Sequence, residues 1–186
     1  MKKIVIYLLL ALLLWGCAAS DSGDDRAMAL RSRLQGGNGC GFDATITADY
    51  GDKTYTFAMG CEFDAHGNLS FTVKEPQTIA DIKGMIDGSG GKLTFDGNAL
   101  SFPLLCDGQA SPVSAPWIVY RTLKGGYLKT SVQEDDLLHL TIDDSYADDA
   151  LQLDIWLNTD SNPVRAEIVY ESRRILTVQI ENFQIK

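Results

Sequence analysis

The chain has 186 residues, of which 45% are hydrophobic and 22% are charged, and its formal net charge at pH 7 is -9. This length and composition suit a globular chain with a sizeable core. The acidic balance excludes a nucleic-acid partner, because nucleic-acid binding depends on Lys and Arg side chains that neutralise phosphates.

Residues 1–16 have the pattern of a lipoprotein signal peptide. Two lysines precede the apolar run IVIYLLLALLLW, which is too short for a comfortable membrane span. The run ends in LWGC, which resembles a bacterial lipobox. The resemblance implies cleavage before Cys17 and acylation of its thiol, for example by palmitate, although Trp15 replaces the small residue usual at that position. A plain secretory signal with an incidental cysteine is the alternative.

Acylation of Cys17 predicts a lipid anchor, because two or three acyl chains together hold a protein stably in a membrane. The protein is then expected on the extracytoplasmic side of the cell membrane or the outer membrane. Cleavage removes two lysines and no acid, which gives the mature chain a formal net charge of about -11. Residues 17–25, CAASDSGDD, are small and acidic and predict a lipidated, flexible tether. Residues 26–186 are expected to form a single domain.

The first elements after the tether are a short helix and a hairpin. DDRAMALRSRLQGG predicts the helix, with acids in its first turn and a glycine at its end. The hydrophobic period then changes to two, and the strands GFDATITADY and TYTFAMGC flank the turn DYGD. Pairing about this turn makes the numbers of opposed residues sum to 101. The inward residues of the three elements are Ala27, Leu30 and Leu34; Phe42, Ala44, Ile46 and Ala48; and Tyr55, Phe57, Met59 and Cys61.

The same register places Cys40 opposite Cys61. Directly opposed strand residues have Cβ atoms close enough for a disulfide, and an exported protein meets oxidising conditions. The sequence therefore predicts a Cys40–Cys61 disulfide at the open end of the hairpin. Two buried free thiols remain an alternative, and Cys106 is a third candidate for pairing.

The rest of the chain predicts further strands, an interruption and a second helix. NLSFTV is a strand, EPQTIADIKGMIDGSGG breaks the alternation, and KLTFDGNALSF is a hairpin around Asp96-Gly97. SAPWIVYRTLKGG predicts a helix capped by Ser114, with Pro116 in its first turn and Gly125 as its end. Five strands follow: GYLKTSVQ, DLLHLTID, ALQLDIWLN, PVRAEIVY and RILTVQIENFQI. The inward residues of all these strands are Leu69, Phe71 and Val73; Leu128, Thr130 and Val132; Leu138, Leu140 and Ile142; Leu151, Leu153 and Ile155; Ala166, Ile168 and Tyr170; and Leu176, Val178 and Ile180.

This order predicts a mainly β (α+β) fold. About ten antiparallel strands cannot stay flat, so we expect one large curved sheet, an unclosed β-barrel, with two or three short helices covering its concave face. Few helical segments are available for that cover. The concave face is therefore expected either to pack on itself or to leave an apolar trough.

The order of elements resembles the LolA/LolB-like fold of lipoprotein carriers and lipid-binding lipoproteins. The segments that carry the resemblance are FTVKEPQTIADIKG, GGKLTFDGNAL and LDIWLNTDSNPVRAEIVYESRRILTVQIENF. It implies an unclosed β-barrel with a helical lid that holds acyl chains. A lipobox in the same chain is a feature of the LolB-like members.

No catalytic motif is present, and we expect neither enzyme activity, nor a cofactor, nor a metal site. The sequence contains no G-x-S-x-G, P-loop, H-E-x-x-H or C-x-x-C pattern. His66 falls in a turn and His139 on the outward side of its strand. The acids of DDSYADDA lack the spacing of a calcium loop and are expected at a solvated hairpin tip; they are Asp143, Asp144, Asp148 and Asp149. Trp156 is out of phase with its inward neighbours and is a candidate contact on the convex face.

The apolar trough is the remaining candidate for function. Bulky, adaptable side chains suit an acyl-chain site, and we expect it to be lined by Phe57, Met59, Phe71 and Trp117. The first hypothesis is a membrane-anchored protein that binds lipid or acylated lipoprotein cargo. The alternative is a non-enzymatic sensor or scaffold that binds a membrane protein partner, with the trough filled as core. The sequence leaves the oligomeric state open.

Overall fold

The computed structural model describes residues 22–186, apart from residues 107–108 and 148–149. The expected signal peptide (1–16), the acylated Cys17 and residues 18–21 of the expected tether lie outside the described residues. Among the helices of the described part, none is both long enough and apolar enough to cross a membrane.

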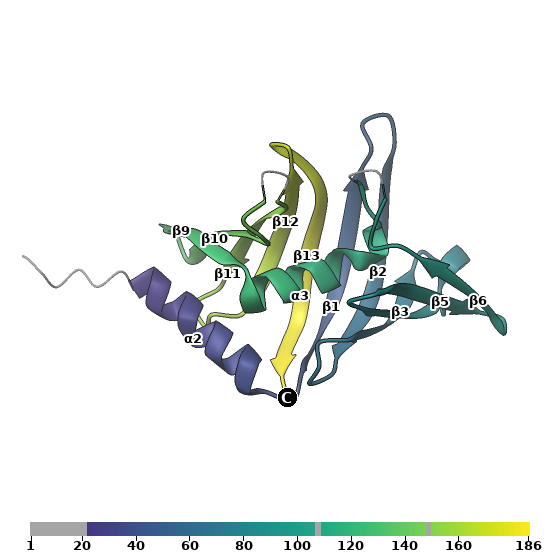
Figure 1. Ribbon diagram of the computed structural model, residues 1–186, viewed down its shortest axis with the longest axis horizontal. Helices are drawn as coiled ribbons and strands as arrows, with labels where there is room; N and C mark the ends of the chain where they lie inside the picture. The colour runs from purple at the N-terminus through teal and green to yellow at the C-terminus, as the bar shows by residue number, and fades with distance from the viewer. Residues whose placement is uncertain (1–21, 107–108, 148–149) are drawn as a thin grey trace, which may run out of the picture.

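The described residues form an eleven-stranded antiparallel sheet (Figure 1). Its strands are β1 (Cys40–Asp49), β2 (Thr54–Phe63), β3 (Leu69–Glu75), β4 (Lys83–Asp87), β5 (Gly90–Phe95), β6 (Asn98–Phe102), β9 (Tyr127–Glu134), β10 (Leu137–Asp143), β11 (Gln152–Leu157), β12 (Pro163–Tyr170) and β13 (Arg173–Ile185). Their spatial order is β6-β5-β4-β3-β2-β1-β13-β12-β11-β10-β9. The first and last strands therefore pair in the middle, while β6 and β9 remain as free edges. This confirms the expected mainly β, unclosed architecture.

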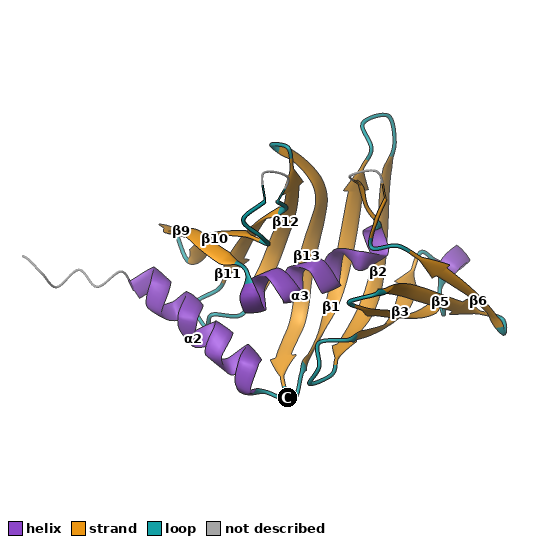
Figure 2. Ribbon diagram, viewed as in Figure 1, coloured by secondary structure: helices purple, strands orange, loops and turns teal. Residues whose placement is uncertain are grey.

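Two α-helices accompany the sheet (Figure 2). They are α2 (Ser22–Gly36) and α3 (Ala115–Gly125); the short elements are the 3-10 helices η2 (Gln77–Ile79) and η3 (Pro112–Ser114) and the small hairpin β7 (Leu105–Cys106) and β8 (Gln109–Ala110). Helix α3 crosses the concave face and packs against β10, β11, β12 and β13, while α2 packs against α3 and β9. The apolar faces of sheet and helices meet in one continuous core.

Helix α2 begins at Ser22, so residues 22–25 of the expected tether form its first turn. Its predicted inward face is confirmed, because Ala27, Leu30 and Leu34 are all buried. The helix lies very close to the sheet. A Cβ atom at Gly23 would lie 2.9 Å from the Ser131 hydroxyl, so a larger side chain there would force the two elements apart.

The predicted Cys40–Cys61 disulfide is wrong. Strands β1 and β2 pair with residue numbers that sum to 103, which places Cys40 opposite Phe63 and Cys61 opposite Phe42. The turn consists of Gly51-Asp52, and the Tyr50 amide donates to the Lys53 carbonyl (3.0 Å). Both thiols are free and buried. Burial raises the pKa of Cys40 to about 12 and also raises the pKa of Cys61.

The two-residue error in register leaves the predicted inward faces in place. Because side chains alternate with a period of two, a shift by two residues keeps each side chain on its face. The predicted inward residues of β1 are buried, as are Phe57, Met59 and Cys61 of β2. Tyr55 differs, since 52% of it is exposed; it lies beside the turn, where its ring packs edge-on against Tyr50 at 5.9 Å.

Strand β9 differs from its prediction because of a β-bulge. Thr141 pairs with Thr130, but the next residue, Ile142, pairs with Leu128, so one residue of β9 is left over. An extra residue reverses which face the following side chains occupy. Thr130 and Val132 are therefore exposed, and Ser131 takes the inward direction that was expected of its neighbours.

Two smaller expectations also differ. Residues 83–87, which fall in the segment expected to break the strand pattern, form β4. Helix α3 begins after Ser114 as expected, but the Ser114 hydroxyl caps no helical N–H group. It donates instead to the carbonyls of Ser111 (2.6 Å) and Leu104 (3.2 Å), because the preceding 3-10 turn brings these groups close.

The four strands β10–β13 bury their predicted inward residues, except that Tyr170 is half-buried.

Candidate functional site: the concave face and its pocket

The covered part of the concave face contains the four residues that were expected to line a trough. Met59 is fully buried, and Phe57, Phe71 and Trp117 are 9%, 3% and 7% exposed. All four belong to the continuous core. Under α3 the expected trough is thus occupied by the side chains themselves. Of the four, Trp117 also lines a pocket at the surface.

Aromatic stacking fills the space between α3 and the sheet. The ring of Tyr120, on α3, stacks on Phe63 of β2 with centroids 4.2 Å apart. Phe63 in turn stacks on Phe42 of β1 at 5.7 Å. Such pairs add to the stability that burial alone provides. This column of rings fixes α3 over the middle of the sheet.

The concave face continues beyond this cover onto β4, β5 and β6. Leu93 pairs with Leu100, and Gly91 pairs with Phe102, so these residues share the face that carries buried Ile86. Here the apolar side chains are open to solvent. Leu100 is 65% exposed and Phe95, on the same face of its strand, is 56% exposed, while Leu93 and Phe102 are half-buried against the edge of the core.

We call the residues Leu93, Phe95, Leu100 and Phe102 the open apolar surface. Sequence reasoning placed the hairpin around Asp96-Gly97 but assigned none of these residues to a site. The alternation in KLTFDGNALSF is the signal that would have found them, because it puts all four on one face. Their exposure depends on where α3 lies, and that is a tertiary feature.

Two glycines shape this region by giving space to aromatic rings. A Cβ at Gly84 would lie 2.3 Å from the Phe71 ring, and one at Gly91 would lie 2.1 Å from the Phe102 ring. Real Cβ atoms do not approach that closely, so each ring rests directly on a strand backbone. Gly84 pairs with Phe71 and Leu93, and Gly91 pairs with Ile86 and Phe102, so both glycines lie at the boundary between the covered face and the open apolar surface.

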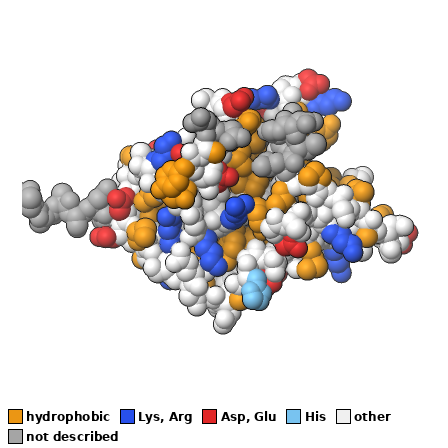
Figure 3. Space-filling view, in the orientation of Figure 1, with side chains coloured by type: hydrophobic (Ala, Val, Ile, Leu, Met, Phe, Trp, Pro, Cys, Tyr) orange, Lys and Arg blue, Asp and Glu red, His pale blue; other side chains and the backbone are white. Residues whose placement is uncertain are grey.

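A pocket of about 380 Å³ lies beside α3 on the concave side. The helix contributes Trp117, Tyr120, Arg121, Lys124 and Gly125, and the turns after β2 and β4 contribute His66, Gly67, Asn68 and Gly88. The Arg121 guanidinium lies over the Trp117 ring (5.2 Å), and the Lys124 ammonium lies over the Tyr120 ring (5.4 Å). In Figure 3, Lys and Arg side chains gather at the middle of this face among apolar groups, with a histidine below them. We call this space the α3 pocket.

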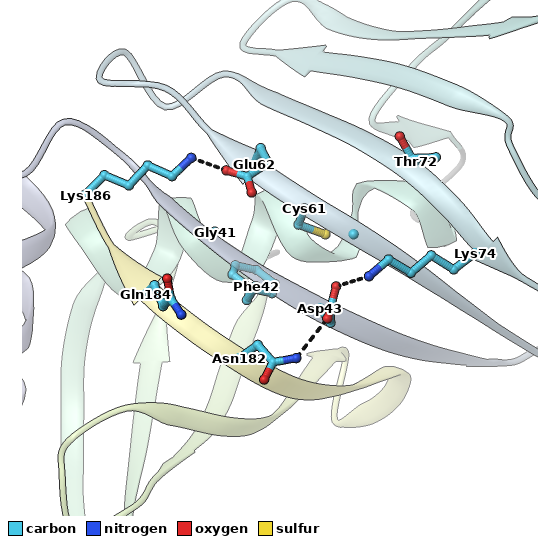
Figure 4. A pocket seen from close by; sticks show the side chains of 11 residues that line it. Gly41, Phe42, Asp43, Cys61, Glu62, Thr72, Lys74, Asn182, Gln184 and Lys186 are labelled. Carbon is cyan, nitrogen blue, oxygen red and sulfur yellow. Dashed lines mark hydrogen bonds and ion pairs between the residues drawn. The ribbon is translucent and has the colours of Figure 1, made fainter.

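A second pocket, of about 400 Å³, lies on the convex face across β3, β2, β1 and β13 (Figure 4). Its charges compensate one another. Lys74 donates to Asp43 (2.5 Å), Asn182 also donates to Asp43 (3.0 Å), and Lys186 pairs with Glu62. The hydrogen bonds from Lys74 and Asn182 lower the pKa of Asp43. Among the described residues that line this pocket, every charged side chain therefore has a partner of opposite charge.

The histidines lie where the sequence predicts them. His66 is in the turn after β2, where its amide donates to Asp64 (2.9 Å). His139 faces outward and lies 3.0 Å from both Glu134 and Asp154. Its ring stacks on Trp156 at 4.5 Å, so Trp156 is on the convex face as expected. The indole N–H of Trp156 donates to Glu134 (2.9 Å) and lowers the pKa of that carboxyl group.

The acidic segment after β10 has structural partners. Asp143 pairs with Lys129 (3.1 Å), and the Asp144 carboxylate accepts a hydrogen bond from the Leu151 amide (2.9 Å). Asp148 and Asp149 lie outside the described residues. Within the described part of the chain, no group of three or more His, Cys, Asp or Glu side chains is placed to hold a metal ion.

Comparison with known proteins gives similarities in structure only. No protein-family model matches the chain, and no curated protein sequence is significantly similar to it. Among solved structures, the chain is similar to a LolA superfamily protein from Nitrosomonas europaea, with 9% identity and a TM-score of 0.44 over 86% of this chain and 93% of that one. A DUF1329 family protein from Desulfovibrio piger gives 10% identity and a TM-score of 0.46 over 89% and 92%. The lipoprotein LppX from Mycobacterium tuberculosis gives 12% identity and a TM-score of 0.41 over 86% and 95%.

Proposed function

We propose that this protein binds the acyl part of a lipid or of an acylated lipoprotein on its concave face. The observation that carries the proposal is the open apolar surface. It continues the core face of the sheet past the end of its helical cover, and it leaves Phe95 and Leu100 more than half exposed. A contiguous apolar face that a folded chain leaves in water is typical of a binding site.

The energy available from such a surface is sufficient for lipid binding. Removing one CH₂ group from water contributes roughly 0.8 kcal/mol. A long acyl chain thus offers on the order of 10 kcal/mol before the costs of ordering and association. Binding of this kind needs no catalytic group. It needs an apolar surface that is open to solvent, and Phe95 and Leu100 at the end of the sheet support the proposal in this respect.

We also propose that Cys17 carries the lipid anchor and holds the protein on the extracytoplasmic side of a membrane. Replacing Cys17 with serine removes the thiol that the lipobox pattern marks for acylation. We expect Cys17→Ser to abolish metabolic labelling with a fatty acid and to leave an uncleaved precursor. Labelling of the variant as strong as that of the wild type would show that the anchor lies elsewhere.

The binding proposal is tested by native mass spectrometry. Protein produced without residues 1–17 is purified in the absence of detergent, after contact with total membrane lipids. We expect a fraction of the molecules to carry an added mass that matches a lipid species and is lost under stronger activation. Spectra that contain only the protein mass, at every lipid concentration tried, would contradict the proposal.

One observation favours the scaffold alternative. Phe57, Met59 and Phe71 are packed as core, so most of the predicted trough is closed. If the covered part of the concave face serves only stability, the open apolar surface would instead bind a protein partner. The absence of bound lipid in native spectra, together with co-purification of a defined membrane protein whose binding is lost in Leu100→Asp, would support this alternative.

A further inference from the structure

We propose that the ligand is an anionic amphiphile, whose charged headgroup binds in the α3 pocket while its acyl chain lies along the open apolar surface. This inference rests on the proposed function and adds the chemical class of the headgroup, a phosphate or a carboxylate.

The pocket presents two cations from one side of α3. Arg121 and Lys124 are three residues apart, and this spacing places side chains next to each other on a helix. Each cation lies over an aromatic ring of the preceding turn, Trp117 or Tyr120, and Lys124 also donates to the Tyr120 hydroxyl (3.2 Å). The rings therefore hold both cations at the pocket wall.

Neither cation is neutralised within the described part of the chain. The ion pairs there involve Lys74, Lys129, Arg165, Arg174, Lys186 and His139, but not Arg121 or Lys124. The described lining of the α3 pocket contains no carboxylate. The pocket is therefore positively charged, although the chain as a whole has a formal net charge of -9.

The acids closest in sequence to the pocket walls are engaged in their own turns. The Asp64 carboxylate accepts hydrogen bonds from the backbone of His66 and from both the amide and the side chain of Asn68. The Asp87 carboxylate accepts two hydrogen bonds from Ser89. These hydrogen bonds lower the pKa of both acids. Both carboxylates are thereby held by the turns and do not line the pocket.

A structural role accounts for only one of the two cations. Lys124 lies in the last turn of α3, where the helix dipole favours positive charge. Arg121 is one turn earlier and is exposed, so its position over Trp117 is not explained by the helix end. A guanidinium held over an indole keeps its N–H donors free for an anion.

The shape of the pocket suits a headgroup whose tail leaves in one direction. Gly67 and Gly88 form part of the wall opposite α3, so backbone rather than side chains faces the helix there. A Cβ at Gly67 would lie 3.3 Å from the Tyr120 ring. Gly88 belongs to the turn between β4 and β5, and β5 carries Leu93 and Phe95 of the open apolar surface. A chain that passes this turn from the pocket meets apolar side chains.

The test compares two amphiphiles that differ only by a phosphate: 1-lauroylglycerol and 1-lauroylglycerol 3-phosphate. Both are titrated into the lipid-free protein below their critical micelle concentrations, and binding is followed by isothermal titration calorimetry. We expect the phosphate form to bind at least tenfold more tightly. In the double variant Arg121→Gln/Lys124→Gln this preference should fall to twofold or less, while the affinity for 1-lauroylglycerol stays unchanged.

A control variant separates the pocket from general charge. Lys53 and Lys83 are exposed and lie outside the α3 pocket, and Lys53→Gln/Lys83→Gln makes the same change in net charge. We expect it to keep the tenfold preference. If both double variants lose the preference for the phosphate form, the preference depends only on the net charge of the protein, and the inference is wrong. Equal thermal unfolding midpoints for the two variants exclude a folding defect.

The remaining outcomes distinguish the headgroup from the acyl site. Inorganic phosphate alone is expected to show no binding at millimolar concentration; affinity equal to that of the phosphate amphiphile would identify a site for free anions instead. If both amphiphiles bind equally well to the wild type, the headgroup inference is wrong and the acyl site stands. If neither binds, both proposals fail.

Discussion

Two parts of the concave face have the same alternation of apolar residues but differ in burial. One part is covered and buried, and the other part, formed by β5 and β6, is exposed to solvent. In the covered part, Phe71 is 3% exposed and belongs to a continuous core. On β6, Leu100 belongs to the same sheet face and is 65% exposed. Alternation along a strand fixes which face a side chain occupies, whereas the position of a single helix decides whether that face is buried or exposed to solvent.

The largest expected effect is a charge placed in the covered part. Phe71→Asp buries an unpaired carboxylate, and we expect the free energy of unfolding to fall by more than about 4 kcal/mol, enough to unfold a marginally stable domain. Urea denaturation followed by circular dichroism measures this loss. Ser70→Asp, at the exposed neighbouring position on the other face, is the control and should change stability by less than about 0.5 kcal/mol. A folded, stable Phe71→Asp protein would show that the space under α3 is open.

Gly84→Ala and Gly91→Ala test the same difference in burial with a smaller change, because each adds only one methyl group. At Gly84 the new Cβ meets the buried Phe71 ring and the Lys92 carbonyl, and we expect a loss of about 1–3 kcal/mol. At Gly91 it meets the half-buried Phe102 ring, which can turn toward solvent, so Gly91→Ala should cost less. Thermal unfolding midpoints of the two variants give the comparison. An equal loss at both sites would mean that Phe102 is held as rigidly as Phe71.

A charge on the open apolar surface is expected to affect binding rather than folding. Leu100→Asp should change the free energy of unfolding by less than about 0.5 kcal/mol, since its side chain is mostly in water already. The affinity for 1-lauroylglycerol should fall about tenfold, which corresponds to about 1.4 kcal/mol. Ser101→Asp, on the opposite face of the same strand, should bind as the wild type does. Equal binding by the two variants would place the acyl chain elsewhere.

The smallest expected effect belongs to the paired charges of the convex face. The pKa of Asp43 is lowered in the folded state by Lys74 and Asn182. A lowered pKa contributes stability above the unfolded-state pKa, and this contribution is lost as the pH falls through the folded-state value. Both charged partners are partly exposed, so we expect Asp43→Asn to cost about 0.2–1 kcal/mol at pH 7. The cost should diminish below about pH 4, as urea denaturation at pH 7 and pH 3 would show.

These contrasts show which parts of the fold follow from local sequence. The strong alternation of β10–β13 predicted their inward residues apart from Tyr170. This held although the ladders contain register shifts between Trp156 and Leu157 and between Ile168 and Val169. The turn DYGD permits two adjacent two-residue loops, and choosing Tyr50-Gly51 in place of Gly51-Asp52 changed every pair and removed the predicted disulfide. The bulge in β9 arises from pairing with β10, and no single residue in GYLKTSVQ marks it.

Of the residues expected to line the trough, Trp117 lies at the α3 pocket, whereas Phe57, Met59 and Phe71 are core. The cations of the pocket were missed because hydrophobic periodicity does not consider them. Their role becomes visible once α3 is placed opposite the turns at His66 and Gly88. Sequence patterns thus identified the apolar face, while the boundary between core and surface required knowledge of how distant elements pack.

If Cys17 carries the proposed lipid anchor, the start of α2 at Ser22 limits how far the folded part can stand from the membrane. Only residues 18–21 separate the proposed anchor at Cys17 from the first turn of the helix. A chain rises at most about 3.6 Å per residue, so five steps reach roughly 18 Å. Helix α2 is itself fixed to the sheet, since Arg26 donates to the Asn158 carbonyl (2.6 Å) and to Ser161 (3.2 Å).

An anchor at Cys17 would therefore keep the start of α2 within roughly 18 Å of the membrane. The hairpin of β5 and β6 lies at the opposite end of the long axis from the start of α2 (Figure 1). If both proposals hold, the lipid anchor and the acyl site lie at opposite ends of the molecule, and transport of the ligand beyond the reach of the anchor would require a second, diffusible carrier.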